Sequence, residues 1–435
     1  MARIRPEIPG FVTVIIQRLK AAGYDTYVVG GAVRDALLKR PIVDWDVATS
    51  APAGKIKTIF RDQRQFALRH DTVTLVHSGA HFEVTPFRGS ENDLINDLSR
   101  RDFTINAMAV DPDDMEVIDP FHGESDIRQR VLRAVGDPEE RFREDPLRLL
   151  RCVRLASELC FRIDTETITG LGKTASLLSS TAPERIRDEL MKLLMTSKPS
   201  GSFYLMVRTG LLKTFLPELL EGYLKQQNHH HRHTIFRHIT ETIDQVRPDP
   251  VLRLTALLHD IAKPRSRVKH RGTWRFCGHE KESALLAEEI LNRLRFSREV
   301  VRRVTHLIRH HMIGYDPGWS DAAIRRLIYR VGDRHIQDLL EFRRADLLAH
   351  GLTDHDPALM AELEQRVAEQ VRQEAPTGRK QLAVNGNTVM EITGLPPGPA
   401  VGRVLRDLHE KVLDHPELNN REELKTILKF IRTYP

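Results

Sequence analysis

Two aspartates one residue apart, Asp44 and Asp46, are the side chains in this sequence that most directly indicate chemistry. They lie in the segment Thr26–Ser50, TYVVGGAVRDALLKRPIVDWDVATS, which begins with a short apolar run typical of a buried strand. We expect a second strand to carry both aspartates, because residues i and i+2 of a strand point to the same face. Two converging carboxylates predict a Mg²⁺ site of the kind that supports phosphoryl transfer.

A glycine pair between these two strands predicts the phosphate-binding part of the same site. Gly30 and Gly31 follow the first strand at once, and without Cβ atoms they let the backbone turn sharply and approach a ligand closely. Residues 32–38 then favour a helix whose free N–H groups would face the ligand, and Arg34 adds a positive charge. Each half alone is more often a tight turn or a solvated strand edge, so the inference rests on their order within one short segment.

In this order, the Gly-Gly pair, the VRD that follows it and the paired aspartates resemble the signature of the DNA polymerase β nucleotidyltransferase superfamily. More narrowly, they resemble the bacterial tRNA nucleotidyltransferase and poly(A) polymerase family. The run Arg100–Ala107, RRDFTINA, resembles a recurrent motif of the same family. That resemblance implies that Arg101, Asp102 and Asn106 hold the phosphates and ribose of the nucleotide. Glu83, on a predicted hairpin strand, is either a third carboxylate near the metal or an ordinary strand residue.

The sequence Glu144–Arg148, EDPLR, matches a motif that serves the resembled family as a protein template for the incoming base. We expect Asp145 and Arg148 to share one face of a helix, where they could also form a plain intrahelical ion pair. As a template, the carboxylate would accept from the amino group of cytosine while the guanidinium donates to N3 and O2. Adenine also has an amino donor next to a ring acceptor, whereas uracil and guanine have the opposite order of donors and acceptors. The resemblance also assigns Arg151 and Arg154 to nucleotide binding.

Histidines and aspartates in the second half of the chain follow one another in the order of a metal site. The adjacent pair His259-Asp260 ends an apolar helix, and on its own it could be packing. The ordered set resembles the HD superfamily of metal-dependent phosphohydrolases. Imidazole with carboxylate ligands suits Mn²⁺, Ni²⁺ or Co²⁺ better than Mg²⁺. The expected ligands are His238, His259, Asp260 and Asp346, with His279 and His310 or His311 extending the site to a second metal.

The connection that precedes the RRDFT motif is short. Only eight residues, Gly89–Asn96, separate Arg88 from Asp97. In the resembled family, enzymes that build the whole CCA end carry a longer flexible loop here, which reorients the template from CTP to ATP. The shortening resembles the CC-adding subgroup, in which a separate enzyme adds the adenosine. A full CCA-adding enzyme, a poly(A) polymerase and a protein whose main activity is HD-type hydrolysis are the alternatives.

The composition indicates a soluble protein of several domains. Its 435 residues are 40% hydrophobic and 29% charged, and three scattered cysteines exclude a disulfide framework. The net charge of +6 suits a nucleic-acid partner but equally a small anionic substrate. No apolar span approaches the roughly 18 residues of a membrane helix, so we predict a cytoplasmic protein without a membrane partner.

We expect an α+β fold in which a nucleotidyltransferase head with a small mixed sheet, residues 1–135, precedes three helical parts. These are a neck that recognises the base (136–225), an HD body (226–350) and a tail that binds tRNA (351–435). The resemblance implies that the partners are tRNA, bound at its 3′ end and elbow, and CTP, with ATP as well if the whole CCA end is built. Two Mg²⁺ ions are the implied cofactors of the head.

Overall fold

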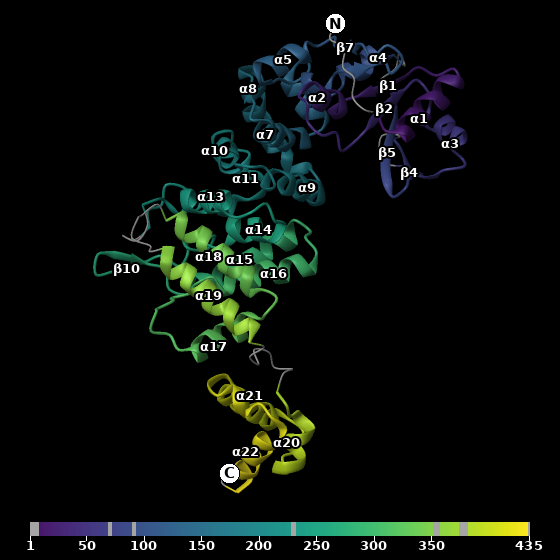
Figure 1. Ribbon diagram of the computed structural model, residues 1–435. Helices are drawn as coiled ribbons and strands as arrows, with labels where there is room; N and C mark the ends of the chain where they lie inside the picture. Colours follow the sequence, from purple (N-terminus) through teal and green to yellow (C-terminus); the bar gives the residue numbers. More distant parts are fainter. Residues whose placement is uncertain are drawn as a thin grey trace. The chain divides into compact units, whose positions relative to one another are not determined.

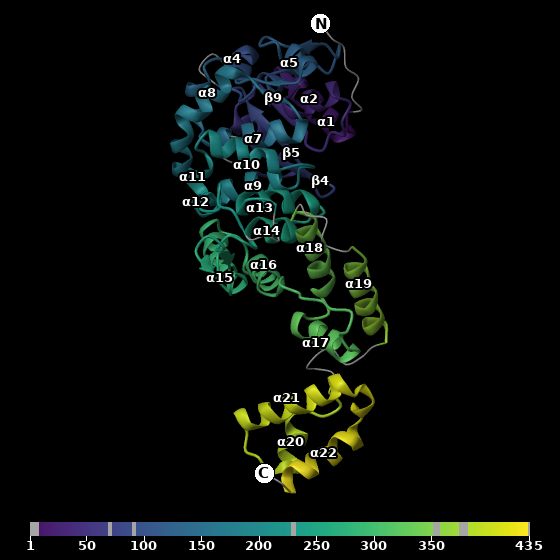
Figure 2. The ribbon, with the colours of Figure 1, turned by 90° about the vertical axis from the view of Figure 1, so that its left-hand side faces the viewer.

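The computed structural model describes residues 8–67, 72–88, 93–227, 232–350, 357–373 and 382–433 (Figures 1 and 2). The chain divides into two compact units, Met1–Pro217 and Glu218–Pro435. The first combines a mixed sheet with helices and the second is almost entirely helical, which confirms the predicted α+β fold. Within the described ranges, no helix is long and apolar enough to cross a membrane. The four-part division with boundaries at 135, 225 and 350 stays a prediction.

A seven-stranded mixed sheet forms the core of the first unit, in the order β3-β4-β5-β2-β1-β6-β7. Its neighbouring strands pair antiparallel except β2 and β5, which run parallel. Because β2 lies between β1 and β5, Asp46 at its start is flanked by Val29 and Glu83. The strands are β1 (Thr26–Val29), β2 (Asp46–Thr49), β3 (Arg64–Ala67), β4 (Val73–His77), β5 (Ala80–Pro86), β6 (Ala109–Val110) and β7 (Val117–Ile118).

Short helices accompany this sheet, and α4 caps one cluster of its buried side chains. That cluster consists of Val29, Ala48, Phe87, Leu98 and Ala109. Since Leu98 belongs to α4, burial of this cluster fixes α4 against the strands that carry Asp46 and Glu83. The helices are α1 (Gly10–Ala21), α2 (Gly31–Leu37), α3 (Ala53–Ile59), α4 (Leu94–Ser99), the 3₁₀-helix η2 (Thr104–Asn106) and α5 (Gly123–Gln129).

Helices make up the rest of the first unit, after a two-residue parallel ladder between β8 (Val131–Leu132) and β9 (Arg162–Ile163). α6 begins at Pro138 because Asp137 caps it and proline suits the first helical position. The helices are α6 (Pro138–Glu144), α7 (Leu147–Leu159), α8 (Thr165–Thr174), η3 (Ala175–Ser180), α9 (Pro183–Leu194), α10 (Ser200–Arg208) and α11 (Leu212–Phe215), with α12 (Pro217–Leu220) at the division between the units.

The apolar helix α14 (Pro250–Leu258) is the centre of the second unit, and all its residues from Val251 onward are buried. It contacts α13 (Ile235–Gln245), α15 (His279–Arg293), α16 (Arg298–His310) and α18 (Ile336–Leu348). The unit also contains a hairpin of β10 (Val268–His270) and β11 (Thr273–Arg275), α17 (Asp321–Val331) and α19 (Pro357–Arg372). A separate apolar cluster holds together α20 (Gly386–Thr393), α21 (Pro399–Asp414), η5 (Pro416–Leu418) and α22 (Arg421–Thr433).

Candidate active site

The turn between β1 and α2 brings an arginine and a carboxylate onto the backbone of Gly30. Gly30 has φ 75° and ψ −132°, a conformation that favours glycine. A Cβ atom there would lie 2.9 Å from Nη1 of Arg101 and 3.4 Å from Oδ2 of Asp46. Glycine at this position therefore leaves room for the guanidinium of Arg101, the candidate phosphate-binding arginine. The approach of a ligand to this turn stays a prediction.

Three carboxylates gather beside this turn. Burial raises the pKa of Asp46, and Asp44 adds to the effect while Arg101 acts against it. Burial also raises the pKa of Glu83, and the charges of Asp46 and Asp44 raise it further. The expectation that one strand carries both aspartates was wrong, because β2 begins at Asp46 and Asp44 is an exposed residue in the loop before it. Mutually repelling carboxylate oxygens are the donor set that fits Mg²⁺.

A buried aspartate that the sequence did not single out holds Arg101 in place. The side chain of Asp97 is fully buried, and its Oδ2 accepts from Nε and Nη2 of Arg101 at 3.1 and 3.0 Å. Its Oδ1 accepts from the backbone N–H of Arg88 at 3.1 Å. Two donors of the guanidinium are thus occupied, and the third nitrogen is the one that lies over Gly30. The DL of the run DLSRRDF is the signal that could have identified this residue.

A second network connects the other residues of the RRDFTINA motif. Oδ1 of Asp102 accepts from Nδ2 of Asn106 at 3.0 Å, and Oδ1 of Asn106 accepts from Nη1 of Arg34 at 2.7 Å. Oδ2 of Asp102 lies 2.6 Å from Nε of Arg151. Burial would raise the pKa of Asp102, but the charge of Arg151 and the amide of Asn106 lower it to about 2. Four of the predicted nucleotide-binding residues are therefore brought together.

The two template residues are not an intrahelical ion pair. Asp145 lies in the extended link between α6 and α7, with φ −143° and ψ 99°, so the expected shared helix face was wrong. Its two oxygens accept from Nη1 and Nη2 of Arg185, at 3.0 and 2.9 Å. Arg148 donates to the carbonyl oxygens of Arg141 and Arg100, at 3.0 and 2.8 Å, and to Glu144 at 2.9 Å. Both side chains are thus held by several fixed partners.

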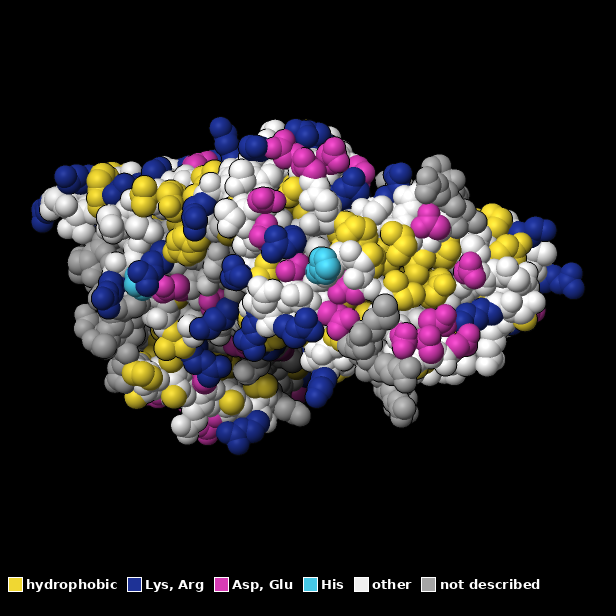
Figure 3. All heavy atoms as spheres, turned by 90° about the horizontal axis from the view of Figure 1, so that it is seen from above, with side chains coloured by type: hydrophobic (Ala, Val, Ile, Leu, Met, Phe, Trp, Pro, Cys, Tyr) yellow, Lys and Arg dark blue, Asp and Glu magenta, His cyan; other side chains and the backbone are white. Residues whose placement is uncertain are grey.

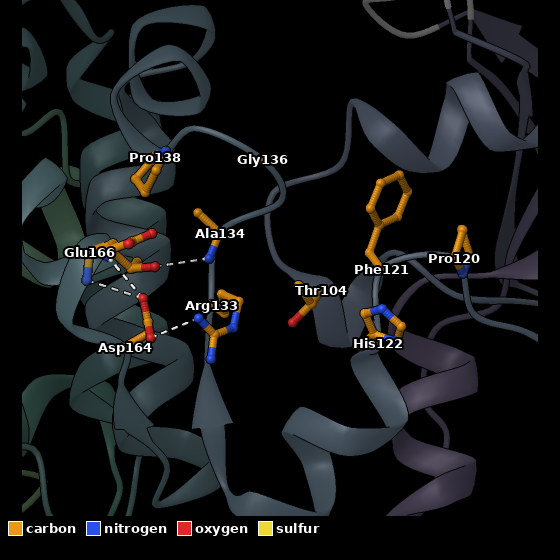
Figure 4. A pocket seen from close by; sticks show the side chains of 11 residues that line it. Thr104, Pro120, Phe121, His122, Arg133, Ala134, Gly136, Pro138, Asp164 and Glu166 are labelled. Carbon is orange, nitrogen blue, oxygen red and sulfur yellow. Dashed lines mark hydrogen bonds and ion pairs between the residues drawn. The ribbon is translucent and has the colours of Figure 1, made fainter.

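Arg154 is separated from this group. It is buried and pairs with Glu189 at 2.6 Å and with Glu158 at 2.5 Å, both on the helical side of the unit. Figure 4 shows a cavity of about 200 Å³, whose lining includes Thr104 of the RRDFTINA motif. On one side of the cavity, Arg133 pairs with Asp164 at 2.8 Å, and Phe121 and Pro120 lie on the opposite side. None of its lining residues was predicted to bind nucleotide.

In the second unit, six histidines and aspartates converge from five places in the chain. One group is His238, His259 and Asp346, and the other is Asp260, His279 and His311. All six side chains are buried, and the candidate ligand atoms of each group lie within 4.8 Å of one another. Asp260 connects its own group to the other, with Oδ1 3.2 Å from Nε2 of His279 and Oδ2 3.2 Å from Nε2 of His259.

The hydrogen bonds of the four imidazoles leave the same nitrogen facing inward. Each Nδ1 lies within hydrogen-bond distance of a backbone carbonyl, at 3.3 Å for His238, 2.9 Å for His259, and 2.7 Å for both His279 and His311. Because a carbonyl only accepts, Nδ1 carries the proton in a neutral ring and Nε2 presents its lone pair. Nε2 of His238 lies 3.2 Å from Nε2 of His259, an approach of two lone pairs that a cation between them would relieve. The donor set therefore fits a pair of transition-metal ions.

His310 does not belong to this cluster, although the sequence left it open against His311. Its ring lies against His306, with centroids 4.7 Å apart, and among the described residues it is in neither group. Burial and the neighbouring His306 lower the pKa of His310 to about 4. The adjacent pair at the C-terminal end of α16 thus divides into one imidazole inside the cluster and one outside it.

Comparison with known proteins identifies the same parts of the chain. The family described as "Poly A polymerase head domain" matches residues 26–133. "Probable RNA and SrmB-binding site of polymerase A" matches residues 160–222, and "tRNA nucleotidyltransferase domain 2 putative" matches residues 274–431. These matches cover the strands with the carboxylates, the helices after the template, and most of the second unit.

Relatives that match nearly the whole chain are CCA-adding and A-adding enzymes. The chain is 31% identical to the CCA-adding enzyme of Levilactobacillus brevis over 92% of both chains, and 33% identical to the A-adding tRNA nucleotidyltransferase of Deinococcus radiodurans over 94% of both. Its fold matches that of the Bacillus stearothermophilus CCA-adding enzyme in complex with CTP, with a TM-score of 0.74, 30% identity and 98% of both chains covered.

Proposed function

The chain belongs to the CCA-adding enzyme family of tRNA nucleotidyltransferases, and we propose that it adds two cytidines to tRNA and then stops. The observation that carries this proposal is the eight-residue connection Gly89–Asn96. Strand β5 ends at Pro86 and α4 already begins at Leu94; residues 89–92 lie outside the described part of the chain. A connection of this length is too short to move the template residues from the position that binds CTP to one that binds ATP.

The surroundings of the template support a fixed preference for cytosine. Burial raises the pKa of Asp145, but the hydrogen bonds from Arg185 act in the opposite direction, and this pKa lies below its ordinary value. Asp145 is thus an anion that accepts from the amino group of the base, while Arg148 donates to N3 and O2. Since Arg148 is tied to Glu144 and to two backbone carbonyls, a second geometry for adenine would break several hydrogen bonds at once.

The head residues then have defined tasks in CMP transfer. Arg101 and Arg34 bind the triphosphate, and Asp102 orients Asn106 and Arg151 beside the ribose. Asp44 and Asp46 would hold Mg²⁺, which supplies charge neutralisation at the phosphates when bound. The 3′-OH of tRNA attacks the α-phosphorus, pyrophosphate leaves, and the proton of the hydroxyl is released to solvent or to a nearby carboxylate.

Product length tests the proposal. A tRNA transcript that ends at its discriminator base would be incubated with CTP, with ATP and with both, and resolved at single-nucleotide length. Two nucleotides from CTP, with none added by ATP, are expected, and a separate A-adding enzyme would then have to complete the end. Three nucleotides would make the chain a full CCA enzyme, a ladder from ATP a poly(A) polymerase, and one nucleotide from ATP on a transcript ending in CC an A-adding enzyme.

The inward-facing imidazoles favour a second function, metal-dependent hydrolysis of 2′,3′-cyclic or terminal phosphates. Bound transition-metal ions would supply Lewis acidity at a phosphate and an activated water. The neighbouring histidines of α16 give a matched test: His311→Ala should lose bound Mn²⁺, measured by mass spectrometry of the purified protein, and hydrolysis of a cyclic phosphodiester. His310→Ala should keep both. Equal metal content in the two variants would overturn this assignment.

A further inference from the structure

In the sequence, the hairpin of β10 and β11 lies between Asp260 and His279, two members of one group of the histidine cluster. The segment 261–278 leaves the cluster directly after Asp260 and returns directly before His279. In Figure 1 it projects from the helices of the second unit, at the label β10. Val268 on β10 is 64% exposed, so the strand lacks the apolar cover that would make it part of a core. This arm therefore starts and ends at residues of the cluster, and all three residues of β10 are exposed.

The arm is strongly basic. Residues 261–279 include six Lys or Arg and no Asp or Glu. Lys263 and Arg265 pair at its base, with Asp260 and Glu221 respectively. For the other four, no carboxylate within the described ranges lies at ion-pair distance; they are Arg267, Lys269, Arg271 and Arg275. By contrast, the face drawn in Figure 3 shows basic, acidic and apolar side chains interspersed.

One face of the arm combines these charges with an aromatic ring. Lys269 is opposite Trp274 in the ladder, and two residues earlier Arg267 approaches the same ring. The guanidinium carbon of Arg267 lies 3.6 Å from the ring centroid of Trp274, and Nζ of Lys269 lies 5.7 Å from it. Nε of Arg267 is buried without a hydrogen-bond partner in the part of the chain that is described. Cations beside an indole and a stacked guanidinium plane are the combination that binds single-stranded RNA.

We propose that this hairpin is an RNA-binding arm that brings the phosphorylated end of a single-stranded polynucleotide to the histidine cluster. The proposal rests on the hydrolytic function proposed for that cluster and adds a substrate class to it, polynucleotides rather than mononucleotides. In the reaction, the oxygen of water bonds to phosphorus, one bond from phosphorus to a ribose oxygen breaks, and that oxygen takes a proton. The arm takes no part in this step; it raises occupancy through contacts with the preceding phosphates.

The test compares two substrates on the full-length protein with Mn²⁺: a short single-stranded RNA with a 2′,3′-cyclic phosphate end, and 2′,3′-cyclic CMP. In Lys269→Glu/Arg275→Glu, kcat/KM for the RNA should fall at least tenfold, and that for the mononucleotide should stay unchanged. The salt dependence for RNA should also weaken by about 1.4 in log–log slope, at about 0.7 per lost phosphate contact. The matched control is Arg298→Glu/Arg302→Glu, which reverses two exposed charges on α16. It should keep both the wild-type kcat/KM for the RNA and the wild-type salt dependence.

The proposal that the hairpin binds RNA would be overturned if Lys269→Glu/Arg275→Glu lowered kcat/KM equally for both substrates. It would also be overturned if kcat/KM fell for neither. If the wild-type protein hydrolyses neither substrate, the hydrolytic function fails, and the arm is then judged by binding alone. Ultraviolet cross-linking of the same RNA should label the peptide that contains Trp274, and the label should disappear in Lys269→Glu/Arg275→Glu. Cross-links that map only elsewhere would refute the arm independently of the chemistry.

Discussion

Replacing the fully buried Asp97 by asparagine tests whether binding of the CTP triphosphate depends on a residue that does not itself contact the nucleotide. In Asp97→Asn, the amide oxygen can still accept from the backbone N–H of Arg88, but the amide nitrogen faces the donors of Arg101. Breaking a buried ion pair by removing one partner typically costs about 3–5 kcal/mol. The unfolding free energy of the first unit should therefore fall by about 3 kcal/mol, measured by denaturant titration.

Activity should respond through nucleotide binding. Arg101 loses the carboxylate that aims it at Gly30, and a hydrogen bond to a charged group is worth about 1.5–3 kcal/mol. A loss of about 2 kcal/mol corresponds to a roughly 30-fold rise in KM for CTP. Steady-state CMP incorporation at saturating tRNA measures this rise, and kcat should change less.

A matched control lies on the same helix. Asp93 caps α4 by accepting from the backbone N–H of Asn96 at 2.9 Å, and asparagine is an equally good cap. Asp93→Asn should therefore leave both stability and KM close to those of the wild type. A variant at Asp97 that is destabilised as expected, yet binds CTP normally, would show that Asp97 serves the fold alone and that its role in aiming Arg101 was misjudged.

Three further changes have defined outcomes. Asp46→Asn should abolish CMP transfer while filter binding of tRNA stays unchanged; loss of both would indicate misfolding. Asp102, whose pKa is held at about 2 against about 3.9 when unfolded, should contribute about 2–3 kcal/mol above pH 5 that disappears as the pH falls from 4 to 2. The difference in unfolding free energy between wild type and Asp102→Asn should shrink over that range, and a constant difference would contradict the pairing with Arg151. Arg185→Ala should free Asp145 and reduce the preference for CTP over ATP in single-nucleotide incorporation; an unchanged preference would mean that Arg185 does not fix the template.

Much of the first unit could be predicted because its signals are local. The helix predicted over residues 32–38 is α2, and the predicted hairpin is β4 and β5. Motif order also identified the residues that line the Gly30 turn. The strand β3, the β8–β9 ladder and the β10–β11 hairpin were missed, since two to four residues are too few for a periodic pattern.

The misjudged residues depend on contacts between distant segments. The sequence gives no means to see that Asp145 pairs with Arg185, 40 positions further along, or that Asp46 and Glu83 are neighbours in a parallel pair of strands. The choice of His311 over His310 could not be made from type or spacing either. It depends on how the end of α16 packs against α14, which places His311 beside His259, whereas His310 contacts His306 one turn earlier on α16 itself.

The short connection acts on both halves of the site through α4. At its start, the backbone N–H of Arg88 donates to Asp97, which ties the end of β5 to α4 and fixes Arg101. Directly after α4, the carbonyl of Arg100 accepts from Arg148 at 2.8 Å. Any movement of α4 would therefore shift Arg101, the candidate phosphate-binding residue, and Arg148 of the base template together. A long loop could absorb such a movement, whereas a short one opposes it. Under the proposed CC-adding function, the anchoring of α4 would therefore contribute to the selection of cytosine together with Asp145 and Arg148.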